Sequence, residues 1–69
     1  MLETYEVVDT RDPKWRTTAV RLAHSKVPFL IVGAEAAAER SFNDGLKVGF
    51  GLDVTVNADG VCFRPKHSG

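Results

Sequence analysis

The side chains that most often do chemistry are few in this sequence, and their spacing matches no common catalytic arrangement. Cysteine occurs once, as Cys62, and histidine twice, as His24 and His67. A cysteine nucleophile needs an adjacent base, a redox thiol usually lies in a Cys-x-x-Cys pair, and a zinc site needs closely spaced ligands. None of these patterns is present, so the sequence predicts no catalytic residue, no bound metal and no cofactor.

Carboxylates and glycines also lack the spacing that a catalytic or nucleotide site requires. Glu35 and Glu39 would share one face of a helix, but beside Arg40 they are typical of a solvated surface. The glycines at 45, 49 and 51 precede an expected strand, whereas a phosphate-binding loop precedes a helix. We therefore expect the protein not to be an enzyme.

A basic cluster is the strongest candidate for a functional site. Around the single tryptophan, Trp15, five cationic residues lie within sixteen positions: Arg11, Lys14, Arg16, Arg21 and Lys26. Arginine and aromatic residues together are typical of hot spots in protein interfaces. We expect Arg11, Trp15, Arg16 and Arg21 to contact a partner macromolecule. The alternative interpretation is a solvated helix face whose tryptophan anchors the helix to the core.

The overall charge favours a protein as that partner. Lys plus Arg and Asp plus Glu both number 9, so the formal net charge is zero. Nucleic-acid affinity depends largely on neutralising phosphates, so a nucleic-acid-binding domain that uses the basic patch around residues 11–26 is the alternative. The expected function is that of a small non-catalytic binding module or regulator. The short length alone also suggests an accessory protein of a phage or mobile element.

Length and composition limit the cellular setting. No run of eighteen apolar residues predicts a membrane span, and the first nine residues, MLETYEVVD, lack the features of a signal peptide. With a single cysteine, these features predict a cytoplasmic protein. A chain of 69 residues has a small core, so a homo-oligomer paired through an exposed sheet edge is also possible.

The positions of these residues depend on a strand followed by a helix in the middle of the chain. The apolar run at 27–32 predicts a buried strand. An alanine-rich helix is expected over 34–44, ended by Gly45 in a left-handed conformation. In that helix Arg40 and Asp44 would pair across one turn, and Asn43 would face solvent.

Strands are expected on both sides of this unit. One is predicted over 2–8 and another over 46–57, where apolar and polar residues alternate. Asp59-Gly60 is a strong hairpin signal, so a return strand is predicted over 61–64. Residues 1–65 would form a single globular domain, and 66–69 a frayed polar tail.

The segment 13–24 decides between two folds. A helix places Trp15, Ala19 and Ala23 on one face, with Asp12 as the N-cap. The expected fold is then α+β, in the order β-α-β-α-β-β, with a four-stranded sheet, two helices and a C-terminal antiparallel hairpin. The first two strands would be parallel. If 13–24 is extended, the order becomes β-β-β-α-β-β, an antiparallel sheet with one helix.

Overall fold

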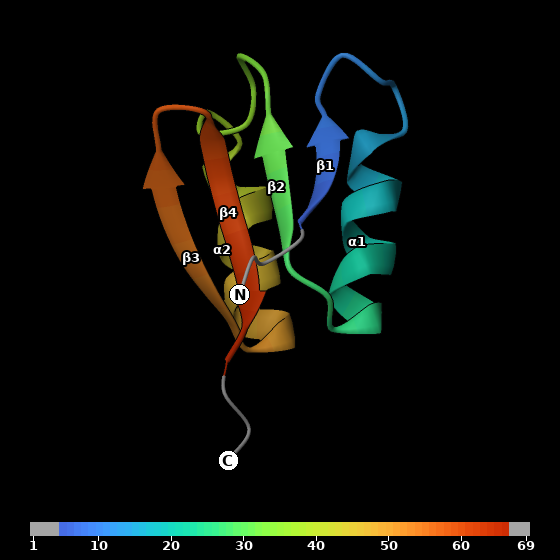
Figure 1. Cartoon of the computed structure of the whole chain (residues 1–69), viewed down its shortest axis with the longest axis vertical. Coiled ribbons are helices and arrows are strands. Elements are labelled where there is room, and N and C mark those ends of the chain that lie inside the picture. The colour runs from blue at the N-terminus through green and yellow to red at the C-terminus, as the bar shows by residue number, and fades with distance from the viewer. Residues whose placement is uncertain (1–4, 67–69) are drawn as a thin grey trace.

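The computed structural model describes residues 5–66 and has the order β-α-β-α-β-β. The elements are β1 (Glu6–Asp9), α1 (Trp15–Ser25), β2 (Phe29–Val32), α2 (Arg40–Phe50), β3 (Leu52–Asn57) and β4 (Gly60–Pro65). The strands lie in the order β1-β2-β4-β3 (Figure 1). Strand β1 is parallel to β2, and β4 is antiparallel to β2 and β3. The predicted α+β fold is confirmed, and the one-helix alternative is wrong.

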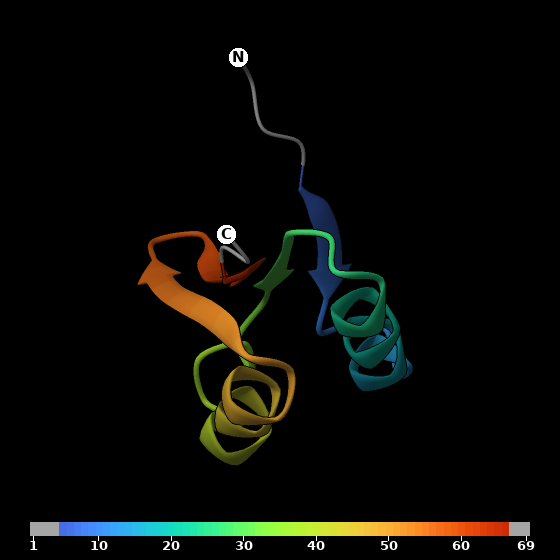
Figure 2. The ribbon, with the colours of Figure 1, turned by 90° about the horizontal axis from the view of Figure 1, so that it is seen from below.

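Both helices lie on the same face of the sheet, which gives the molecule two layers (Figure 2). Because side chains alternate between the two faces of a strand, every second residue of the sheet points toward the helices. Phe29 pairs with Phe63, and Ile31 pairs with Val61, and all four side chains are buried. The core lies between these residues and the buried faces of α1 and α2.

Helix α1 packs on the sheet through small side chains and one large ring. Trp15, Ala19 and Ala23 are buried at a spacing of four residues, as the sequence predicts. The helix begins two residues later than expected, because Asp12 caps a turn before it. The Asp12 Oδ1 accepts the Lys14 N–H at 3.0 Å, and the Asp12 carbonyl accepts the Trp15 N–H at 3.0 Å.

The predicted position of the second helix, 34–44, is wrong. Residues 34–38 form turns, and α2 spans Arg40–Phe50. The expected strand over 46–57 is correspondingly shorter, since its first five residues belong to the helix and β3 begins at Leu52. The sequence predicts Gly45 as the left-handed residue that ends the helix. It is Gly51 instead, which has φ +64° and caps the C-terminus of α2.

Packing against the sheet explains this shift. Phe42, Leu46 and Phe50 recur every four residues and belong to the core or pack against it. A helix over 40–50 therefore buries more apolar surface than an alanine-rich helix over 34–44 can. That gain offsets the roughly 1 kcal/mol that each helical glycine costs relative to alanine. Gly45 and Gly49 are accordingly tolerated inside α2.

The two ends of the chain extend past the described residues. Residues 2–4 of the predicted first strand lie outside the described part, as do residues 67–69 of the predicted tail, with His67. Lys66, the first residue of that tail, donates its N–H to the Gly51 carbonyl at 3.3 Å. This bond ties the end of β4 to the junction between α2 and β3.

Two glycines are expected to respond to alanine substitution with opposite signs. Gly60 has φ +153°, and a Cβ there would overlap the carbonyl oxygen of Ile31. Gly49 is helical and a Cβ there meets nothing. We expect Gly60→Ala to destabilise the protein by more than about 1 kcal/mol and Gly49→Ala to stabilise it by about 0.5–1 kcal/mol. Urea unfolding followed by Trp15 fluorescence measures both, and an unchanged stability of Gly60→Ala would contradict the β3–β4 turn geometry.

Candidate functional site

Trp15, the aromatic residue of the predicted contact set, lies in the core. Its side chain is 2% exposed. Its ring packs edge-on against Phe42 of α2, with centroids 5.2 Å apart and planes at 79°, an arrangement that aromatic pairs favour. In this position the indole joins α1 to α2. This is the role that the alternative interpretation of the sequence gives it, as an anchor of the helix to the core. It presents no surface that a partner could contact.

Arg16 is held in an ion-paired cluster between the two helices. Its guanidinium lies 4.5 Å from the centroid of the Trp15 ring. Its Nη2 is 3.1 Å from the Glu39 Oε2 and 4.0 Å from the Glu35 Oε1. The charge of Arg16 is thus largely neutralised within the molecule, and the side chain connects α1 to the turns before α2.

Arg11 is also paired, with the last residue of β1. Its Nη2 lies 2.9 Å from the Asp9 Oδ2, and its backbone N–H donates to the Asp9 Oδ1 at 2.9 Å. These two kinds of hydrogen bond hold the pKa of the Asp9 carboxyl below its ordinary value. The side chain of Arg11 is 88% exposed, so the pair lies at the surface.

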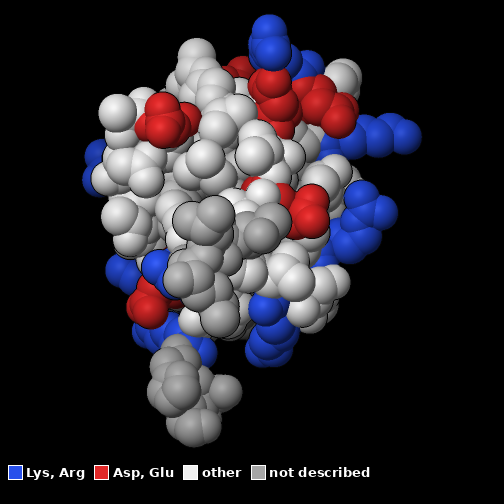
Figure 3. All heavy atoms as spheres, viewed as in Figure 1, with Lys and Arg blue, Asp and Glu red and all other residues white. Residues whose placement is uncertain are grey.

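Three cations of the basic cluster keep unneutralised charges. Lys14, Arg21 and Lys26 are exposed, and within residues 5–66 none of them forms an ion pair. Lys14 precedes α1, Arg21 lies seven residues further on the same face, about 10 Å along the axis, and Lys26 caps the helix. We call these three residues the α1 basic face. Figure 3 shows cationic side chains along the edge of the molecule that α1 forms.

The segment of the chain that carries this face contributes little negative charge. Residues 13–34 include no aspartate or glutamate. Asp12 is the one acidic side chain in contact with this face among the described residues, since its Oδ1 accepts the Lys14 N–H at 3.0 Å. Glu35 and Glu39, which follow the segment, pair with Arg16. The α1 basic face therefore projects a local positive potential although the whole chain has no net charge.

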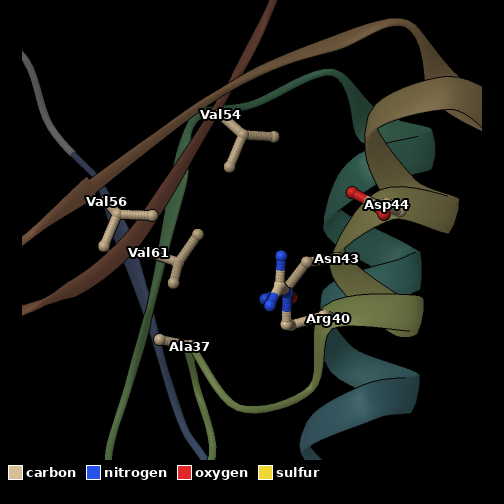
Figure 4. A pocket seen from close by; sticks show the side chains of 7 residues that line it. All are labelled: Ala37, Arg40, Asn43, Asp44, Val54, Val56 and Val61. Carbon is tan, nitrogen blue, oxygen red and sulfur yellow. The ribbon is translucent and has the colours of Figure 1, made fainter.

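A second candidate is a cleft between α2 and the hairpin (Figure 4). Its volume is about 170 Å³. The lining residues are Ala37, Arg40, Asn43, Asp44, Val54, Val56 and Val61. The expected pair between Arg40 and Asp44 is absent from the described ion pairs, so both charged groups border the cleft without neutralising each other.

Asn43 lies at the base of this cleft and was missed by sequence reasoning. It is 9% exposed, whereas the sequence predicts a solvated position. Its Nδ2 donates to the Ala36 carbonyl at 2.7 Å, but its Oδ1 is buried and has no hydrogen-bond partner among the described residues. The spacing of Phe42, Leu46 and Phe50 is the signal that could have placed it, because a helix continued through Gly45 turns Asn43 inward.

The cysteine lies on the face of the sheet that neither helix covers. Cys62 is buried and lines a hollow of about 200 Å³ with Tyr5, Leu30 and Asn57. His24 packs instead against Phe50, with ring centroids 4.8 Å apart. Among the described residues, therefore, Cys62 has no histidine beside it that could act as a base.

Comparisons of the chain with protein-family models, with curated proteins and with solved structures find no match. Over residues 5–66, no three histidine, cysteine or acidic side chains are placed to hold a metal ion. Neither described helix has the length and apolar character needed to cross a bilayer. The α1 basic face and the cleft are therefore the two candidate functional sites.

We expect the two arginines of α1 to differ in their effect on stability. Arg16→Ala removes an aromatic contact and an ion pair and should destabilise the fold by about 0.5–2 kcal/mol. Arg21→Ala removes an exposed side chain that pairs with no acidic residue of 5–66 and should change stability by less than about 0.5 kcal/mol. Urea unfolding measures both. Equal effects of the two substitutions would contradict the structural role of Arg16.

Proposed function

We propose that the protein is a non-catalytic binding module whose α1 basic face docks on an acidic surface of a partner protein. The observation that supports this proposal is the set of three exposed cations, Lys14, Arg21 and Lys26, that form no ion pair with an acidic side chain of residues 5–66. Complementary charge across an interface steers association and selects among partners. An acidic surface is the partner chemistry that such a face would recognise.

The packing of α1 supports the same proposal. Trp15, Ala19 and Ala23 hold the helix against the sheet, and Arg16 ties it to the turns before α2. The three cations consequently extend from a backbone that is already ordered before a partner arrives. An ordered surface loses less conformational entropy on binding, which favours a preformed docking face over a segment that folds on contact.

A protein partner fits these residues better than a nucleic acid does. The pairs Arg11–Asp9 and Arg16–Glu39 remove two cations from the five in the sequence cluster. Three remaining contacts would give a salt dependence of only about 3 in log K against log salt. Proteins that depend on phosphate contacts commonly use more, so nucleic-acid binding is the alternative outcome that the test below distinguishes.

Other features of the setting belong to the same proposal. A cytoplasmic location is favoured by the single cysteine.

The edge strands of the sheet are β1 and β3, and self-association through either edge remains a prediction of the sequence. In that case the sedimentation coefficient of the free protein would rise with its concentration.

Charge reversal on the α1 basic face is the most direct test of the function. We expect Lys14→Glu with Arg21→Glu to weaken capture of the partner from a cell lysate at least about tenfold, because like charges brought together cost several kcal/mol. Quantitative capture on immobilised protein, in the presence and absence of nuclease, measures this. The captured protein should be rich in acidic surface, should elute as salt is raised, and should survive nuclease treatment.

A matched control is available on the rest of the molecule. Lys47→Glu with Arg64→Glu makes the same change in net charge at exposed positions on α2 and β4, outside α1. This control should capture the partner as the parent protein does. Equal losses in the two double variants would contradict a specific docking face, and loss of the captured material after nuclease treatment would favour the nucleic-acid alternative.

A further inference from the structure

The cleft between α2 and β3 combines an apolar wall with polar groups on the opposite side. Val54, Val56 and Val61 point from the sheet toward α2, and Arg40, Asn43 and Asp44 reach from α2 toward them (Figure 4). Val56 is 67% exposed, so this part of the apolar wall is open to solvent. The arrangement matches small-molecule sites, in which apolar walls bury the ligand and a few polar groups orient it.

The amide of Asn43 points to a missing hydrogen-bond donor. Its Nδ2 is fixed by the Ala36 carbonyl at 2.7 Å, which also orients the Oδ1. That oxygen is buried without a partner in the part of the chain the structure describes. A buried acceptor without a donor is costly, and buried polar groups are rarely left in this state. A ligand that brings a donor into the cleft would remove this cost.

The charged side chains at the mouth of the cleft indicate that its ligand carries charged groups as well as a hydrogen-bond donor. Arg40 and Asp44 lie one helical turn apart, both line the cleft, and neither has an ion-pair partner within residues 5–66. Arg40 is the first residue of α2, whose positive helix end attracts anions. The N–H groups of Ser41 and Phe42 in this first turn also find no acceptor there. The site is therefore suited to a ligand that carries both a negative and a positive group.

From these contacts we propose that the cleft binds a free α-amino acid with a branched aliphatic side chain. The ligand carboxylate pairs with Arg40 at the start of α2. The ligand ammonium donates to the Asp44 carboxylate, and a turn of the Asn43 side chain brings its buried Oδ1 to the ammonium as a second acceptor. The aliphatic side chain of the ligand packs on Val54 and Val56. The volume of about 170 Å³ suits this size, since a protein cavity of about 150 Å³ can hold benzene.

The proposal is tested by titrating the full-length protein with L-valine and following amide, Asn43 side-chain and valine methyl signals by NMR. We expect saturable shifts confined to the cleft. Isobutylamine lacks the carboxylate and isovalerate lacks the ammonium, so each should bind at least about tenfold more weakly than valine. Arg40→Met and Asp44→Asn should weaken valine binding by a similar factor.

Two control variants separate binding in the cleft from a general effect of charge. Lys47→Met and Asp53→Asn remove exposed charges of α2 and β3 that do not line the cleft, and both should bind valine as the parent protein does. The proposal is overturned if valine produces no saturable shifts at concentrations that would fill a millimolar site. It is equally overturned if the two analogues bind as well as valine, or if Arg40→Met and Asp44→Asn bind it unchanged.

Discussion

Phe29 and Phe63 stack across the centre of the sheet, with ring centroids 4.9 Å apart and planes at 11°. Both rings are fully buried. Phe29 belongs to β2 and therefore to the β1–α1–β2 half of the chain, whereas Phe63 belongs to β4 and to the α2–β3–β4 half. Their contact, with the β2–β4 pairing around it, joins two halves that are each too small to bury a core. The position of every other element depends on this junction.

The two candidate sites follow from the way each half attaches to the junction. Helix α1 covers the β1–β2 side of the sheet and is closed against α2 by Trp15 and Phe42, so Lys14, Arg21 and Lys26 are left outside. Helix α2 lies against β3, and the space left beside its first turn is the cleft that contains Asn43. Helix α1, which carries the basic face, and strand β3, which borders the cleft, lie on opposite sides of the molecule (Figure 1). A macromolecule on α1 need not obstruct a small ligand beside α2.

Local sequence patterns predicted most of the fold, because their signals lie within single elements. The spacing of Trp15, Ala19 and Ala23 identified α1, and Asp59-Gly60 identified the hairpin. The position of α2 could not be predicted in this way. Asn43-Asp44-Gly45 has the local form of a helix end, and only the burial of Leu46 and Phe50 against the sheet, a tertiary effect, outweighs it.

The candidate sites were less predictable for the same physical reason. The basic cluster is visible in the sequence, but which of its cations are neutralised depends on Glu39, more than twenty residues from Arg16. Trp15 and Phe42, whose rings are in contact, are also far apart along the chain. The cleft depends on the inward orientation of Asn43, which follows from the corrected position of α2. Pairings of this kind arise only once the two halves are assembled.

Native-state hydrogen exchange tests most directly whether the junction holds the functional surface in place. If it does, the amides of β2, β4 and the buried face of α1 exchange together, with the free energy and the urea dependence of global unfolding. The exposed cations would then extend from a helix that opens only when the whole fold opens. Exchange of the α1 amides at a much lower free energy, with little dependence on urea, would show that the helix detaches locally and would contradict the account.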